Sequence, residues 1–468
     1  MNRVSLNTAL QVLTRGIELS SGLFVNACLA RQWGSQAFGQ IGFIAGLASV
    51  CAFLFHFGLG NLLTRTIARD PKQARHYLVN ALIALLPLAL LGSAVLLGLG
   101  VASRASVYSA LLALSCAQMV LAAVSQLIRA TFYAFERMEF DGAAVFGERA
   151  CILIGGLYLA FLPPNLWAYF ACLVFSKAVN VLVSAVLFVR HILPLTERAV
   201  PRLSLQKGLL KQAFPFGLDV AFTVLYTSLD VILIASWGGE EAAGQYRAVG
   251  MLVLPLTMIA LALINSLFPR MSALGLSDPE AFGACSRSAA RLLMLAAMPI
   301  ALFTFLYAPS IVATLFGPAY APAAPLLRVL SLVIPLRFIN ELLATSLTAC
   351  DRQRRRTLCV GIVAAFSTLA YLVLIARYHA QGAAITALCA ELVMLALLAR
   401  GMRPLWGAAI PGGEAAARGL VLAGAILLPL AWLGVPLWAA AVALGVIYPL
   451  LLVRGRVLTE GELQLLRG

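Results

Sequence analysis

The chain has 468 residues, of which 62% are hydrophobic and only 11% are charged. Apolar runs of about 20 residues recur along its whole length, and each is long enough to cross a ~30 Å hydrocarbon core as a helix. This composition excludes a soluble globular protein, and the length of the runs excludes a membrane β-barrel, whose strands alternate over about 10 residues. The sequence therefore predicts an all-α polytopic membrane protein.

Apolar runs bounded by glycine, proline and charge clusters predict about 14 transmembrane helices. They lie near 8–30, 38–60, 77–100, 107–131, 146–163, 166–190, 212–237, 246–268, 287–308, 325–349, 357–376, 381–400, 417–433 and 436–453. The fifth has the weakest pattern, because Glu148 and Arg149 crowd its start and only a short apolar run follows. Its loss would invert every later helix.

Basic residues are distributed unevenly between alternate connections. With a cytoplasmic amino terminus, most of the 34 lysines and arginines lie on the inside, and this count includes Arg149. The outside connections hold only Arg31, Arg104, Arg247, Arg328 and Arg377. This is the bias of the positive-inside rule, and it predicts that both termini are cytoplasmic.

The net charge of +15 is spread over short loops between the predicted helices. Anionic lipid headgroups and membrane topology explain such a distribution, whereas a nucleic-acid-binding protein would gather its charge on one face. The sequence therefore predicts no nucleic-acid partner.

Motifs for catalysis or metal binding are absent from the sequence. The nine cysteines are scattered without a C-x-x-C motif, the four histidines lie in four different segments, and there is neither an H-E-x-x-H motif nor a glycine-rich phosphate loop. We therefore expect a protein that is not an enzyme and that has no cofactor or metal, with coupling to H⁺ or Na⁺ left open.

One segment occurs twice. Residues Trp33–Gln40 recur as Trp237–Gln245 with one residue inserted, and each copy joins two long apolar runs. Superposing the tryptophans, which are 204 residues apart, also matches polar residues of the preceding run: Arg15 with Asp219 and Asn26 with Asp230. Two related halves with polar groups at matched depth indicate a transporter whose site lies between its repeats.

The duplication predicts three regions. Residues 1–200 form an amino-terminal six-helix lobe, and residues 201–405 form a carboxyl-terminal six-helix lobe. Residues 406–468 add two helices and a cytoplasmic tail.

Several short motifs occur in a characteristic order. A basic loop precedes Phe214-Pro215-Phe216-Gly217-Leu218, and Leu225-Tyr226, Leu229-Asp230 and the turn at 238–246 follow. Further matches are Phe268-Pro269-Arg270-Met271-Ser272, Leu315-Phe316-Gly317-Pro318-Ala319-Tyr320 and Gly382-Ala383-Ala384. In this order the chain resembles Wzx-like oligosaccharide flippases of the polysaccharide-transporter group over about residues 5–400, most specifically at 214–246. That group belongs to the multidrug/oligosaccharidyl-lipid/polysaccharide exporter superfamily.

The resemblance implies two six-helix lobes in a V around a central cavity, with two extra carboxyl-terminal helices. It also implies that a polyprenyl-pyrophosphate-linked oligosaccharide repeat unit moves from the cytoplasmic to the outer leaflet of a bacterial inner membrane, by alternating access, for surface polysaccharide biosynthesis. The implied partners are an undecaprenyl-pyrophosphate-linked glycan and membrane lipids, with a polysaccharide polymerase and a chain-length regulator as further candidates.

Three cations fall inside predicted helices: Arg15, Lys177 and Arg337. A charge near the bilayer centre costs several kcal/mol (from about 2.5 to above 10) unless it is paired or hydrated, so such residues usually face a cavity or a partner. They are the candidate substrate-binding cations. Internal pairing is the alternative, because Glu18 and Glu341 lie three and four residues after Arg15 and Arg337. Lys177 has no such partner in its own helix.

Span seven carries a polar stripe. At 100° per residue, Asp219, Thr223, Tyr226 and Asp230 fall on one face, and Asn26 shares a face with Arg15 in span one. Candidate gating or coupling residues are Asp219, Asp230, Glu18 and Glu341, and candidate cavity-lining residues are Asn26, Thr223 and Tyr226. Alternatively, Asp219 is hydrated at the inner end of its helix and Asp230 caps the outer end.

Two other functions remain open at this point. A cation-coupled drug or metabolite antiporter of the same superfamily would prefer acidic residues in the amino-terminal lobe, where this chain has Arg15 and Lys177. A non-transporting scaffold of a polysaccharide assembly complex would not need buried charges at matched depth.

Overall fold

The computed structural model describes residues 3–102, 108–406 and 412–455. Throughout these ranges every regular element is a helix, which confirms the all-α fold class. The chain packs as two compact units, Met1–Gly244 and Gln245–Gly468. The predicted lobes, 1–200 and 201–405, were defined by the sequence duplication, whereas these units are defined by packing. The lobes therefore stay a prediction.

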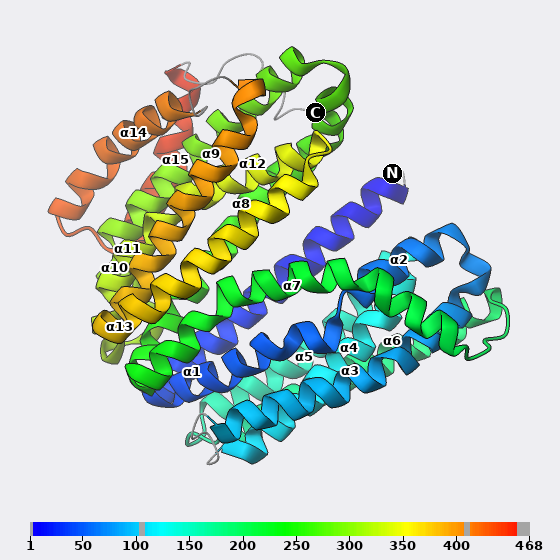
Figure 1. The fold of residues 1–468 in the computed structure, drawn as a ribbon. Coiled ribbons are helices and arrows are strands. Elements are labelled where there is room, and N and C mark those ends of the chain that lie inside the picture. Colours follow the sequence, from blue (N-terminus) through cyan, green and yellow to red (C-terminus); the bar gives the residue numbers. More distant parts are fainter. Residues whose placement is uncertain (1–2, 103–107, 407–411, 456–468) are drawn as a thin grey trace. The chain divides into compact units, whose positions relative to one another are not determined.

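The first unit is built from long helices. They are α1 (Arg3–His56), α2 (Leu59–Arg69), α3 (Ala74–Ala102), α4 (Ser109–Ala134), α5 (Met138–Ala160), α6 (Leu166–Leu187) and α7 (Leu203–Trp237), and α8 (Glu240–Ser277) begins there (Figure 1). Helix α1 packs against α5 and α7, whereas α6 packs against α4 and α5. The seam between α1, α5 and α6 therefore lies within one tightly packed group of helices.

The second unit contains the rest of α8 and seven further helices. They are α9 (Pro279–Leu306), α10 (Ala308–Phe316), α11 (Ala324–Ser331), α12 (Val333–Ala349), α13 (Gln353–Trp406), α14 (Gly413–Trp432) and α15 (Leu437–Arg454). Helix α9 packs against α12 and α14, and α12 packs against α13.

The predicted number of crossings agrees with these helices. Within the described ranges, ten helical stretches are long and apolar enough to cross a membrane, and two of them, Leu13–Arg69 and Gln353–Arg403, are long enough to cross twice. Their turning points are residues with non-helical backbone, Gly34 in α1 (φ 80°) and His379 in α13 (φ 47°). With α7 and α12 included, fourteen crossings result, and the chain is a multi-pass membrane protein.

Helix α5 confirms the uncertain fifth span but begins earlier than expected, at Met138 rather than near residue 146. Glu148 and Arg149 therefore lie in the middle of this helix, and the assignment of Arg149 to a cytoplasmic segment is wrong. The helix tolerates both charges because each has a partner on a neighbouring helix, a compensation that the local sequence does not reveal.

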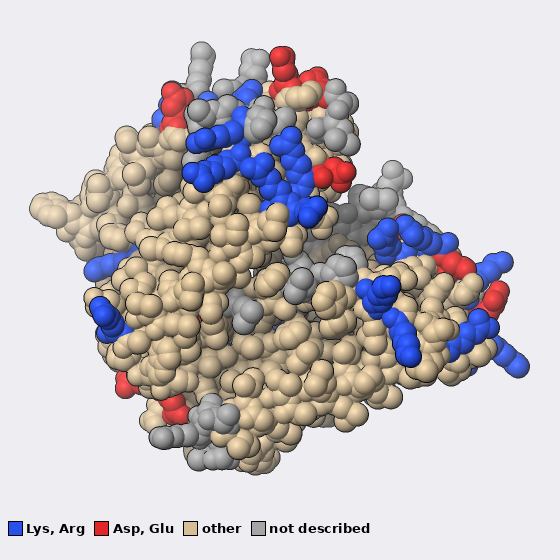
Figure 2. All heavy atoms as spheres, in the orientation of Figure 1, with Lys and Arg blue, Asp and Glu red and all other residues tan. Residues whose placement is uncertain are grey.

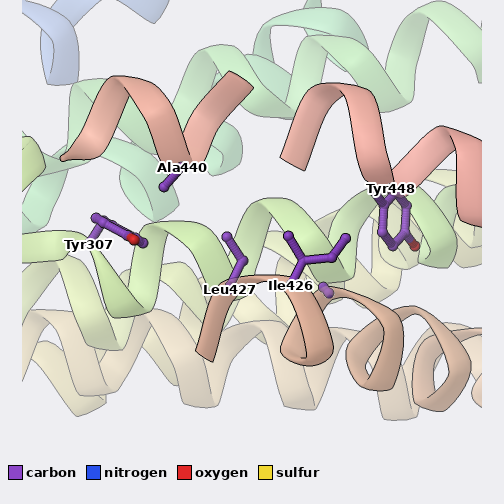
Figure 3. Close-up of a cluster of buried hydrophobic side chains, with 6 residues drawn as sticks. Tyr307, Ile426, Leu427, Ala440 and Tyr448 are labelled. Carbon is purple, nitrogen blue, oxygen red and sulfur yellow. The ribbon is translucent and has the colours of Figure 1, made fainter. Parts of the chain in front are cut away.

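The two carboxyl-terminal helices pack within the second unit. Figure 3 shows Ile426 and Leu427 of α14 with Ala440 and Tyr448 of α15 in a buried apolar cluster that also includes Tyr307. The Tyr448 hydroxyl donates a hydrogen bond of 2.6 Å to the carbonyl oxygen of Leu295 in α9. The two extra helices are thus anchored to α9 by packing and by a buried polar contact.

The duplicated segments cross each other within the first unit. A Cβ added at Gly39 would overlap the carbonyl oxygen of Glu240, and one added at Gly244 would overlap the carbonyl oxygen of Ser35. Past the inserted residue the two copies are offset by 205 positions, so Gly39 corresponds to Gly244 and Ser35 to Glu240. The crossing therefore has internal two-fold symmetry, and the missing side chains allow backbone-to-backbone contact.

Polar contacts surround the crossing. Gln40 Nε2 donates to Glu240 Oε2 at 2.8 Å, and the Tyr108 hydroxyl donates to the other oxygen of this carboxylate. Ser35 Oγ donates to Glu241 Oε1 at 3.3 Å. The start of α8 is thereby held against α1 and α4.

A second repeated element follows α4 and α12. Glu136 and Asp351, 215 residues apart, both have positive φ (55° and 56°). Each lies in a turn closed by three backbone hydrogen bonds. Arg137 N–H donates to the Phe132 carbonyl, and Arg352 N–H donates to the Leu347 carbonyl at the equivalent position. The N–H groups of the two residues before each arginine also donate to equivalent carbonyls. The duplication therefore extends to backbone geometry that the sequence comparison did not include.

Charged side chains cover little of the visible surface. Figure 2 shows lysines and arginines in separate groups on this face, whereas uncharged residues form most of it. We expect both termini and the connections at 61–76, 191–211 and 350–356 to face the cytoplasm. Labelling of single cysteines placed in these segments with a membrane-impermeant maleimide checks this, and one segment labelled from outside would contradict the fourteen-span topology.

Candidate functional site

The first unit carries charges at mid-membrane depth. Helix α5 has 23 residues and α6 has 22, and Glu148, Arg149 and Lys177 lie near their midpoints. Many secondary transporters hold their substrate sites near the bilayer midplane. These three residues are therefore the starting point for the candidate site.

Lys177 is paired across the helix seam. Its Nζ lies 2.6 Å from Glu148 Oε1, so the partner that its own helix lacks comes from α5. Asn180, one turn further along α6, donates to the second oxygen, Glu148 Oε2, at 2.8 Å. Ser125 of α4 donates to Asn180 Oδ1 at 2.5 Å. Glu148 and Asn180 are fully buried, and the cluster joins α4, α5 and α6.

A second carboxylate lies between two arginines. Glu18 Oε2 is 2.7 Å from Nη1 of Arg15, and Glu18 Oε1 is 2.8 Å from Nη2 of Arg149. Arg149 Nη2 is also 3.9 Å from Glu148 Oε1, which connects this group to the Lys177 pair. The ion pairs thus form one continuous network from α1 through α5 to α6.

The network becomes more buried from Arg15 to Glu148, and Lys177 at its other end is 16% exposed. The exposed fraction of the side chain falls from 66% at Arg15 to 26% at Glu18 and 17% at Arg149, and is 5% at Glu148. It contains three cations and two carboxylates, so it carries one net positive charge. The exposed end can meet an anion from solution, and the buried end is neutralised by protein groups.

A separate ion pair lies between α4 and α5. Arg129 Nε is 2.5 Å from Asp141 Oδ1, and both side chains are largely buried. Arg129 also donates to the Tyr133 hydroxyl at 3.4 Å. We read this group as structural, because both charges are satisfied within the helix seam.

The second unit holds a related cluster. Arg337 Nε of α12 is 2.9 Å from Glu391 Oε1 in the second half of α13. Asn340 donates to Glu391 Oε2 at 2.8 Å and to the Glu391 carbonyl at 3.0 Å. The ion pair at Arg337 is therefore with Glu391 on another helix, whereas the sequence suggested Glu341 as the structural partner.

Both clusters use one chemical arrangement. In each, a cation and an asparagine three residues later bind the two oxygens of a buried glutamate from a neighbouring helix. The offset of 215 residues that relates the turns at Glu136 and Asp351 also makes Ser125 the repeat equivalent of Asn340. Ser125 of α4 contacts Asn180 of α6, and Asn340 of α12 contacts Glu391 of α13, whereas the ion pair of the first unit joins α6 to α5.

The remaining predicted residues are placed unequally. The side chains of Asp219, Thr223 and Tyr226 lie outside the described residues. Asp230 is buried, and its Oδ1 accepts from the Val231 N–H at 2.8 Å. Asn26 Nδ2 donates to the Gly22 carbonyl at 2.8 Å, and its buried Oδ1 has no partner. The polar stripe of span seven stays a prediction.

Sequence reasoning missed Glu148 and Glu391, which pair with Lys177 and Arg337. It also missed three further groups that bind the carboxylates of these clusters: Arg149, Asn180 and Asn340. The available signal was the shared spacing of Lys177 to Asn180 and Arg337 to Asn340, combined with a glutamate in the middle of another apolar run. Among the residues that the structure describes, no group of three His, Cys, Asp or Glu is placed to hold a metal.

Several solved structures share this fold. The lipid II flippase MurJ in an inward closed conformation has a TM-score of 0.73 and 14% identity, covering 97% of this chain and 99% of that one. An inward-facing multidrug resistance MATE family transporter of the MOP superfamily has a TM-score of 0.61 and 15% identity, covering 82% and 94%. A Vibrio cholerae MATE transporter has a TM-score of 0.58 and 15% identity, covering 86% and 98%.

The sequence comparison gives the family. No curated protein matches the chain in sequence. The family described as polysaccharide biosynthesis protein matches residues 3–274, more than half of the chain and all of the first unit's described helices. This match shows that the chain belongs to the polysaccharide biosynthesis protein family.

Proposed function

We propose that the protein is a flippase that moves a polyprenyl-pyrophosphate-linked oligosaccharide repeat unit from the cytoplasmic to the outer leaflet of a bacterial inner membrane. The observation that supports this most directly is the mid-membrane network with its net positive charge and its exposed Arg15. Family membership supports a role in polysaccharide biosynthesis.

The cargo explains why such a network would be useful. A pyrophosphate headgroup carries about two negative charges, and an unpaired charge in a ~30 Å hydrocarbon layer is strongly disfavoured. Arginine binds phosphate oxygens through two parallel N–H donors, so Arg15 is suited to receive the headgroup. The other network members would then set how strongly it is held.

We further propose that transport proceeds by alternating access, that both termini are cytoplasmic, and that transport is coupled to H⁺, Na⁺ or the membrane potential. The proposed partners are the undecaprenyl-pyrophosphate-linked glycan and membrane lipids, together with a polysaccharide polymerase and a chain-length regulator. The short connections between helices leave the sugar chemistry to other proteins.

A drug or metabolite antiporter would need an acidic group free to bind a cationic drug. In the first unit, Glu18, Glu148 and Asp141 each already contact an arginine or lysine. This arrangement favours an anionic cargo over a cationic one.

Deleting the gene tests the proposed function. We expect undecaprenyl-linked oligosaccharide intermediates to accumulate in the inner membrane and surface polysaccharide to be lost, with both restored by the wild-type chain. Greater sensitivity to cationic drugs without accumulation would support the antiporter instead. Loss of polysaccharide without either result would indicate a scaffold.

Replacing Arg15 tests the binding role. We expect Arg15→Ala to lower export about tenfold at normal protein levels, because losing one charge-assisted contact of about 1.4 kcal/mol is a factor of ten. Arg15→Lys should keep part of the activity, since it keeps the charge and loses the paired donors. Arg137→Ala, which removes an exposed arginine that pairs with Glu139, is the matched control. Wild-type export by Arg15→Ala would contradict this role.

A further inference from the structure

We propose that Glu18 is a built-in counter-anion, which occupies Arg15 and Arg149 in the empty transporter and releases them to the phosphate groups of the cargo. The proposal rests on the proposed function for its anionic cargo. It adds Arg149 as a second residue that binds the cargo, and it makes Glu18 a competitor of the cargo phosphate for both arginines.

The geometry of Glu18 is that of an anion held between two binding groups. Each of its oxygens contacts a different guanidinium, at 2.7 Å for Arg15 and 2.8 Å for Arg149. Phosphate oxygens make the same kind of charge-assisted contact with arginine. A phosphate group that arrives at this place would meet the two cations already spaced around an anion.

Arg149 has unused capacity for an anion. Its Nε is buried and has no hydrogen-bond partner, although its Nη2 is paired with Glu18. A Cβ at Gly22 would lie 3.9 Å from Arg149 Nη1, so α1 presents no side chain at this point. A carboxylate offers two oxygens, whereas a pyrophosphate offers more, and it can therefore satisfy donors that Glu18 leaves unpaired.

The differences in exposure among these side chains predict the order in which an incoming anion contacts them. Arg15 is exposed, Glu18 is partly covered, and Arg149 lies deeper. An incoming anion would first contact Arg15, then displace one Glu18 oxygen, and then reach Arg149. Arg149 would keep its longer contact with Glu148 on the inner side, so it would not be left without an opposite charge.

A competing carboxylate also explains how cargo could be released. Two arginines without a counter-anion would be costly to leave empty inside a membrane and would hold a phosphate tightly. With Glu18 present, the empty and loaded states are closer in free energy, and a small differential affinity is enough to move the population between them.

The variant Glu18→Gln separates competition from structural support. It keeps the shape of the side chain and removes its charge. We expect the purified full-length protein to bind inorganic pyrophosphate about tenfold more tightly, which corresponds to about 1.4 kcal/mol, while export in cells falls. Tighter binding with slower export is a combination that loss of a purely structural contact would not produce.

Glu139→Gln is the matched control. Glu139 is on α5 and forms a 3.0 Å ion pair with Arg137, but both side chains are exposed. This variant should change neither pyrophosphate binding nor export. If Glu18→Gln yields too little folded protein, Glu18→Asp provides a second test, because its shorter side chain weakens competition while keeping the charge, and binding should still tighten.

The outcomes distinguish this proposal from the proposed function. Unchanged or weaker pyrophosphate binding by folded Glu18→Gln protein would overturn the counter-anion role, even where gene deletion causes lipid-linked intermediates to accumulate. Tighter binding by Glu18→Gln without accumulation on deletion would support the counter-anion role and reject the oligosaccharide cargo.

Discussion

Replacing Lys177 with methionine should destabilise the protein strongly. The substitution removes the closest cation of the buried Glu148 carboxylate and leaves it only the 3.9 Å contact with Arg149. Breaking a buried pair by removing one partner costs about 3–5 kcal/mol. We expect a lower thermal unfolding midpoint in detergent and less protein in the membrane. Asn180 would remain as the nearest hydrogen-bond donor to Glu148, but it carries no charge.

The double variant Glu148→Gln with Lys177→Met should recover most of that stability. It removes both charges from the seam, and replacing a buried pair by uncharged groups is often neutral or stabilising. The network would keep its one net positive charge, because Arg15, Arg149 and Glu18 remain. Export should therefore recover together with stability if that net charge acts on the cargo. Arg137→Met controls for loss of an exposed cation, at the residue directly before α5. Additive effects of the two single changes would show that the pair is not coupled.

Adding one methyl group at Gly39 should destabilise the protein severely. The new Cβ would overlap the Glu240 carbonyl, which belongs to the backbone and cannot rotate away. Moving α8 away from α1 would also break the contacts of Glu240 with Gln40 and Tyr108. We expect a cost above about 4 kcal/mol, seen as loss of folded protein by fluorescence-detected size-exclusion chromatography.

Gly250→Ala is the control on the same α8 helix. No heavy atom lies within 4 Å of a Cβ added there, so the change should be neutral or slightly stabilising. Gly244→Ala should reproduce the Gly39→Ala result, because it meets the Ser35 carbonyl in the equivalent contact. Normal expression of either crossing variant would show that the two backbones are free to separate.

The membrane fold could be predicted from sequence because its signals are local. A run of apolar residues identifies a spanning helix by itself, and the order and number of crossings followed from fourteen such runs. The beginning of α5 was misplaced for the same reason. Glu148 and Arg149 were read as a boundary, since the residues that neutralise them, Lys177 and Glu18, are distant in the chain.

The candidate site was predictable in part. The sequence identified the three mid-membrane cations and the helical pairing of Arg15 with Glu18, because charge within an apolar run is a local feature. It did not identify Glu391 as the partner of Arg337, since nothing in the local pattern states which face of α12 meets α13. Pairing across helices depends on which helix faces pack together, and a single sequence does not show this.

The glycine crossing also describes how the molecule could have originated. When residue i of one copy meets residue j of the other and j meets i in return, the contact has the self-complementary form of an interface between identical subunits. Gly39 with Glu240 and Gly244 with Ser35 satisfy this condition. A half-length ancestor with a single copy of the segment could therefore have associated with itself through this crossing, and fusion of two such genes would have turned an intermolecular interface into an intramolecular one.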